Sequence, residues 1–146
     1  MAHFAELNNS NEVLRVVVIS NDDVNANGGD QSSQAETFVS NLVPHSTGGT
    51  AWKQTSYNNN FRKQYAGIGD SFDASKNKFI KQKPFDSWVL DSNDDWQAPV
   101  TYPSKDKVGS ESIGAFWEEN NRRWVGVSDS GENYIWDASS LAWNEA

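Results

Sequence analysis

The sequence predicts a mainly β protein: an antiparallel meander of β-hairpins with one short amphipathic helix near residues 31–43. Three observations lead to this fold class. Short β-branched or alternating segments end in runs rich in Asn, Asp, Ser and Gly, which are typical of hairpin turns. Only residues 31–43 place apolar side chains at helical spacing. One pattern, a bulky residue, an acid, a polar run and an aromatic residue, occurs four times between residues 72 and 143.

The first expected element is a hairpin whose Asn-rich turn covers residues 8–11. Residues 3–7 form its first arm and residues 12–20 its second. The second arm contains four consecutive β-branched residues at positions 16–19, which is typical of a strand covered on both faces. We therefore predict that the second arm is the central strand of the N-terminal sheet.

The helix is predicted over residues 31–43. Ser32 or Ser33 can cap its start, and Pro44 ends it. The simplest arrangement packs this helix on the sheet, and the alternative is an exposed helix that binds a partner. The apolar residues at positions i, i+3, i+4 and i+7 are Ala35, Phe38, Val39 and Leu42.

The other segments are predicted from their turn residues and from alternation. Residues 21–30 include Asn27, Gly28 and Gly29 and are predicted to be a loop. Residues 48–57 alternate as a strand does. Residues 105–112 are polar and contain a glycine, which predicts a mobile connection.

The four copies of the pattern each predict a hairpin. A half-buried strand cannot carry a polar run such as residues 92–95, whereas a hairpin tip can, and the bulky residues then meet across the two arms. The irregular spacing between copies argues against a regular solenoid or propeller. The copies run from Phe72 to Phe79, from Leu90 to Trp96, from Trp117 to Trp124 and from Trp136 to Trp143.

The expected organisation has two parts. Residues 1–70 form a body of hairpin, helix and strand, and residues 71–146 form an array of aromatic-rich hairpins that continues it as one compact or slightly elongated unit. A chain of 146 residues is long enough for one core and marginal for two. The 18 Phe, Trp and Tyr residues supply the apolar area that a chain with only 36% hydrophobic residues otherwise lacks. Four tryptophans are expected in the core: Trp52, Trp96, Trp124 and Trp143.

Composition excludes several classes of partner. A net charge of −8 and a pI near 4.6 oppose binding to nucleic acid or to an anionic membrane. The sequence has no apolar run long enough to span a bilayer and no signal-peptide pattern, so we expect a protein made in the cytoplasm. Since the chain has no cysteine, disulfides, thiolate nucleophiles and thiolate metal sites are excluded.

No motif predicts a catalytic, cofactor or metal site. Asp91, Asn93 and Asp95 imitate the start of a calcium loop, but Trp96 occupies the position that needs glycine and Tyr102 the position that needs glutamate, so a plain turn is predicted. His3 and His45 accompany no nucleophile motif. A glycosidase needs only two carboxylates, so the sequence does not exclude that activity. Because the acids concentrate in turns, however, the prediction is that the protein is not an enzyme.

The possible interface residues are aromatic and basic. Trp88 and Tyr102 lie near prolines, where exposed rings either stack on sugars or anchor a protein interface. Arg62 and Lys63 form a local basic cluster in an acidic protein.

A set of motifs along the chain carries a family resemblance. They lie at residues 1–5, 50–58, 62–69, 84–91, 96–99, 102–103 and 134–137, together with Trp143. With these motifs the chain resembles a family of small proteins widespread in marine tailed bacteriophages, cyanophages especially. The resemblance implies a virion-associated or fibre-related structural protein with no catalytic residues. A segment around residues 109–130 departs from the family pattern.

We therefore expect an accessory structural protein of the phage virion, a capsid decoration protein bound to other virion proteins, with oligomers possible on the particle. The alternative is a tail-fibre or other virion module that binds host-surface carbohydrate.

Overall fold

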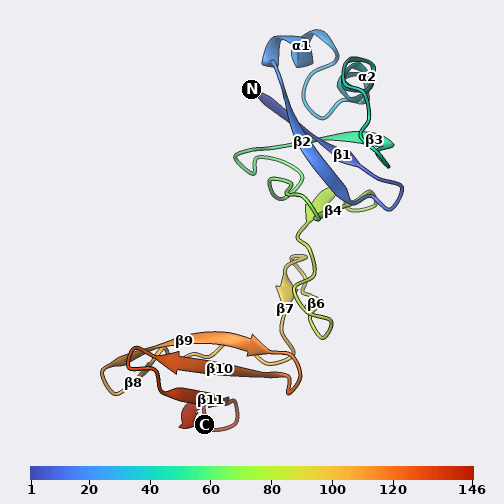
Figure 1. Ribbon diagram of the computed structural model, residues 1–146. Coiled ribbons are helices and arrows are strands. Elements are labelled where there is room, and N and C mark those ends of the chain that lie inside the picture. The colour runs from blue at the N-terminus through green and yellow to red at the C-terminus, as the bar shows by residue number, and fades with distance from the viewer. The chain divides into compact units, whose positions relative to one another are not determined.

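The computed structural model describes all 146 residues and divides them into two compact units, which we call unit 1 (Met1–Gln82) and unit 2 (Lys83–Ala146) (Figure 1). Every paired strand is antiparallel, so the predicted β fold with minor helix is confirmed. The expected division after residue 70 precedes the first aromatic hairpin, and this hairpin belongs to unit 1.

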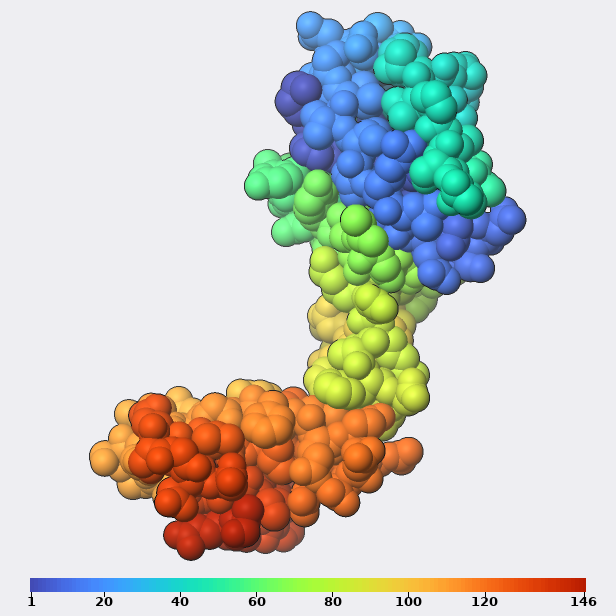
Figure 2. All heavy atoms as spheres, in the orientation of Figure 1, coloured from blue at the N-terminus to red at the C-terminus, as the bar shows by residue number.

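The sheet of unit 1 contains β1 (Ala2–Leu7), β2 (Val13–Ile19) and β3 (Ala51–Thr55) in the order β2-β1-β3. The predicted hairpin is confirmed, but the prediction that its second arm is central was wrong, because β1 is central and β2 is an edge strand. The β-branched run has another cause. Val17 packs on one face of the sheet and Val16 on the other, so both faces of β2 are covered although its outer edge is paired only at Val13. In Figure 2 the N-terminal strands appear in blue, next to the teal atoms of the segment that follows them.

Two helices follow β2. The predicted helix is confirmed as α2 (Ser33–Leu42), and the Ala35 amide donates to the Ser32 hydroxyl over 3.1 Å. The prediction of a loop over residues 21–30 was wrong, because α1 (Asn21–Ala26) begins there after the cap residue Ser20. Helix α1 buries only Val24, and a single apolar residue gives no periodic signal.

Each face of the sheet in unit 1 has its own core. Phe4 and Ala5 point to opposite faces because successive strand residues alternate. One face packs under the helices, and the other packs against the hairpin of β4 (Ser71–Asp73) and β5 (Lys78–Ile80) (Figure 1). The helix-side core contains Ala2, Phe4, Ile19, Val24, Ala35, Val39 and Trp52. The opposite core contains Ala5, Leu7, Val13, Ala66, Phe72 and Phe79.

Unit 2 contains only strands. The short hairpin of β6 (Val89–Leu90) and β7 (Trp96–Gln97) precedes a five-stranded sheet in which each strand pairs with its neighbours in sequence. The sheet strands are β8 (Lys107–Val108), β9 (Glu111–Glu118), β10 (Arg123–Ser128), β11 (Asn133–Asp137) and β12 (Ala142–Glu145). The connection predicted over residues 105–112 was wrong, since β8 turns at Gly109 and pairs with β9.

All four aromatic hairpins form as predicted. In each of them, the bulky residue and the aromatic residue that define the pattern are direct cross-strand partners. The ring centroids are 5.0 Å apart for Phe72 and Phe79, and 5.2 Å apart both for Trp117 with Trp124 and for Trp136 with Trp143.

The acid of the pattern stabilises the turn. The Asp137 carboxylate accepts hydrogen bonds from the Ser139 hydroxyl and from the amides of Ser139 and Ser140, and these bonds lower its pKa to about 2. Asp91 accepts from the amides of Asn93 and Asp95 in the same way. A residue with left-handed backbone then closes each turn: Asn77, Asp94, Arg122 or Leu141. The aspartates of three copies are therefore part of the turn, as in Asx turns, whereas Glu118 of the third copy accepts from the side chains of Asn121 and Arg123.

Candidate binding site

Trp88 and Tyr102, predicted as interface residues, both contact the Trp124 ring of unit 2. The Trp124 ring lies 4.9 Å from Tyr102 and 6.1 Å from Trp88, edge to face in both pairs. Tyr102 is 61% exposed, whereas Trp88 is half-buried. We call the surface around Tyr102, including the two hollows described next, the Tyr102 site.

Two hollows share Val100 and Tyr102 as lining residues. The larger has a volume of about 470 Å³ and the smaller about 200 Å³. The larger is lined by Pro99, Val100, Thr101, Tyr102, Ser104, Trp136, Ala138 and Leu141. The smaller is lined by Trp88, Trp96, Gln97, Ala98, Val100, Tyr102 and Trp124. Concave, mainly apolar surfaces with a few polar groups are the usual form of a binding site.

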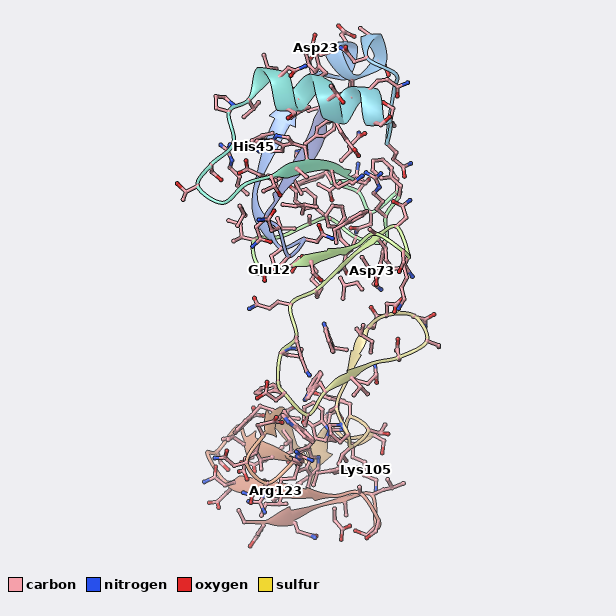
Figure 3. All side chains as sticks on the ribbon, turned by 90° about the vertical axis from the view of Figure 1, so that its right-hand side faces the viewer. Glu12, Asp23, His45, Asp73, Lys105 and Arg123 are labelled. Carbon is pink, nitrogen blue, oxygen red and sulfur yellow. The ribbon has the colours of Figure 1, made fainter.

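The loop that carries Tyr102 is fixed to the sheet by two indoles. The Trp124 Nε1–H donates to the Val100 carbonyl over 2.8 Å, and the Trp143 Nε1–H donates to the Lys105 carbonyl over 2.7 Å (Lys105 is labelled in Figure 3). Pro99, directly before the first anchor, and Pro103, between the two anchors, restrict the backbone of this loop. The tryptophans of two hairpins thus hold Tyr102 in place before any partner binds.

Trp88 packs against other aromatic rings and contributes little exposed surface. Its ring contacts those of Phe85 and Trp117, and its Nε1–H is buried without a hydrogen-bond partner. The preceding residue, Ser87, donates from its hydroxyl and amide to Glu119, which also accepts from the Trp117 indole. These bonds lower the pKa of the Glu119 carboxyl.

Arg62 and Lys63 belong to unit 1, whereas the Tyr102 site belongs to unit 2. The Arg62 side chain is only 6% exposed, because its guanidinium donates to the Gln54 carbonyl over 3.0 Å, pairs with Glu36 over 3.4 Å and lies over the Phe72 ring. Arg62 therefore holds α2, β3 and β4 together. Lys63 is half-buried, and both residues have left-handed backbone.

No protein-family model, curated protein or solved structure matches the chain.

No helix is both long enough and apolar enough to cross a membrane. No three His, Asp or Glu side chains gather in a way that could hold a metal ion.

A buried carboxylate in unit 1 was not predicted. Glu6 is fully buried and accepts hydrogen bonds from Arg15 (2.9 Å), from the Ser46 hydroxyl and amide, and from His45 (2.9 Å), which Figure 3 shows between α2 and β3. Burial raises the pKa of Glu6, but these bonds outweigh it and lower the pKa from 4.5 to about 2. The signal was present, since Glu6 occupies a core-facing position of β1, two residues after Phe4.

Two further groups were missed. Leu141 and Trp136 line the larger hollow because the last hairpin folds beside the Tyr102 loop, a contact between distant segments. In unit 1, the rings of His3, Tyr57 and Tyr65 lie 5.2 to 5.5 Å apart, beside a polar hollow of about 160 Å³. Burial and the positive charge of the N-terminus lower the pKa of His3.

Proposed function

We propose that this protein is an accessory structural protein of a phage virion, a capsid decoration protein that binds another virion protein through the Tyr102 site. The observation that carries the proposal is the grouping of exposed apolar side chains around a preformed hollow. Tyr102 is 61% exposed and Leu141 52% exposed, and both line the larger hollow. Tyrosine is one of the residues that are enriched among interface anchors. The sequence resemblance to marine phage proteins supports the virion setting.

Charge defines the partner more closely. Unit 2 carries twelve Asp and Glu against five Lys and Arg, a net charge of −7, whereas unit 1 carries eight against seven, a net charge of −1. A partner that meets unit 2 would therefore present an apolar projection for the hollow with basic residues around it. Because two indoles already hold the Tyr102 loop, binding loses little loop entropy.

The test is co-sedimentation of the purified chain with particles that lack it. Tyr102→Ala should weaken binding by at least about tenfold, the usual scale for an aromatic anchor. Phe116→Ala is the matched control, since Phe116 is 53% exposed in the same unit but points to the opposite face of β9 from Trp117. Equal binding by both variants, or no binding of the wild type, would contradict the proposal.

A second candidate is binding of host-surface carbohydrate by a tail-fibre or other virion module. The observation that favours it is that the exposed Tyr102 ring lies among Thr101, Ser104 and Gln97, whose hydroxyl and amide groups can bond sugar hydroxyls while the ring stacks on the sugar face. A glycan array separates the two functions. Glycan binding that Tyr102→Ala abolishes, with no binding to particles, would favour the carbohydrate module.

A further inference from the structure

The outer side of β2 is paired only at its start. The Val13 amide donates to the Asp70 carbonyl over 2.8 Å, and the Gly69 amide donates to the Val13 carbonyl over 2.9 Å. Beyond Val13, no segment of the chain makes a backbone hydrogen bond to this side of β2. Alternate amides and carbonyls over residues 14–19 are therefore free to pair with another strand.

This edge lacks the features that usually block strand pairing. Exposed edges commonly carry lysine, proline or an unpaired charge. Strand β2 reads VLRVVVI, and its one charge, Arg15, already pairs with Glu6 and donates to the Pro44 carbonyl over 2.7 Å. Leu14, Val16 and Val17 are partly exposed and Val18 is 51% exposed, so the edge also offers apolar area.

We propose that β2 pairs antiparallel with β2 of a second copy of this chain, about a two-fold axis at Val17, and joins two three-stranded sheets into one. A two-fold axis perpendicular to a sheet preserves its faces, so one residue of the strand must face its own copy. With Val17 at the axis, residues 15–19 pair and the segment that covers Val13 stays clear. Arg15 then faces Ile19 of the second copy and Val16 faces Val18, so no like charges meet.

Charge favours unit 1 over unit 2 for this contact. The net charge of unit 1 is −1, so two copies of its sheet approach without strong repulsion, whereas unit 2 carries −7. The residues that pair all belong to unit 1, whereas the Tyr102 site belongs to unit 2. A dimer would thus contain two copies of the Tyr102 site.

The test is sedimentation equilibrium of the full chain at protein concentrations from about 1 to 200 µM, where mass action makes a weak dimer visible. Val18→Lys places a charge on the edge and should weaken dimerisation by at least about tenfold. Val127→Lys is the control, because Val127 is 37% exposed on β10 but is paired on both sides. Circular dichroism checks that both variants fold.

A cross-link tests the register. The chain has no cysteine, so Val17→Cys should give a disulfide-linked dimer on mild oxidation, whereas Val127→Cys should not. A chain that stays monomeric throughout, or a dimer that Val18→Lys leaves unchanged, would overturn the proposal. A dimer in which Val17→Cys forms no cross-link would overturn the register.

Discussion

Units 1 and 2 reach stability by different means. Unit 1 contains one tryptophan, both helices and two cores on the faces of one sheet, and its buried charges are paired. Unit 2 contains six tryptophans, no helix and a net charge of −7. In unit 2, aromatic pairs across hairpins take the place of a helix layer, because each large ring buries about 150–250 Å².

The largest expected effect is that of Trp124→Ala. The Trp124 ring contacts Trp88, Tyr102 and Trp117, and its indole holds the Val100 carbonyl. Removing a buried tryptophan typically costs about 3–5 kcal/mol of the free energy of unfolding. Denaturant unfolding with hydrogen exchange should show the loss in unit 2 and little change in unit 1. Equal loss of protection in both units would contradict the separation of their cores.

A smaller effect is expected for Glu6→Gln, and it should depend on pH. The folded pKa of Glu6, about 2, lies below its ordinary value of 4.5, so the stability that Glu6 contributes is complete above pH 4.5 and is lost as the pH falls toward 2. One pKa unit corresponds to about 1.4 kcal/mol, so the contribution is of the order of 3 kcal/mol.

Urea unfolding of wild type and Glu6→Gln at several pH values tests this. The difference in the free energy of unfolding between the two proteins should be large at neutral pH and shrink below pH 4.5. Hydrogen exchange should locate this difference in the amides of unit 1. A difference that is the same at every pH would show that Glu6 acts through packing alone.

The smallest effect is expected at the turn of the last hairpin. Asp137→Ala removes the acceptor for the amides of Ser139 and Ser140 and should lower the melting temperature slightly. Glu132→Ala, in the turn before β11, removes an exposed acid whose carboxylate accepts no hydrogen bond, and should leave the melting temperature unchanged. Equal effects of the two substitutions would mean that net charge, and not the turn bond, matters.

Local features were predictable from the sequence. All four aromatic hairpins follow from a pattern within eight residues, because a turn and its flanking pair are specified by near neighbours. The edge position of β2 depends on β3, which lies more than thirty residues further along the chain, so a run of valines could not reveal it.

The site was predictable in part. Trp88 and Tyr102 were recognised by composition, but the hollow beside Tyr102 depends on Leu141 and Trp136 from the last hairpin. Arg62 looked like a surface charge because its partner Glu36 is distant in sequence. Only tertiary packing decides which charges and rings reach the surface.

The most direct test of the proposed function is the number of copies bound per particle at saturation, with Tyr102→Ala and Phe116→Ala in parallel. A capsid decoration protein should saturate at copy numbers on the order of hundreds, since capsids repeat one surface many times. Tyr102→Ala should lose this binding and Phe116→Ala should keep it. Saturation at a few copies or about a dozen, the number expected of a tail or neck, would contradict the capsid assignment.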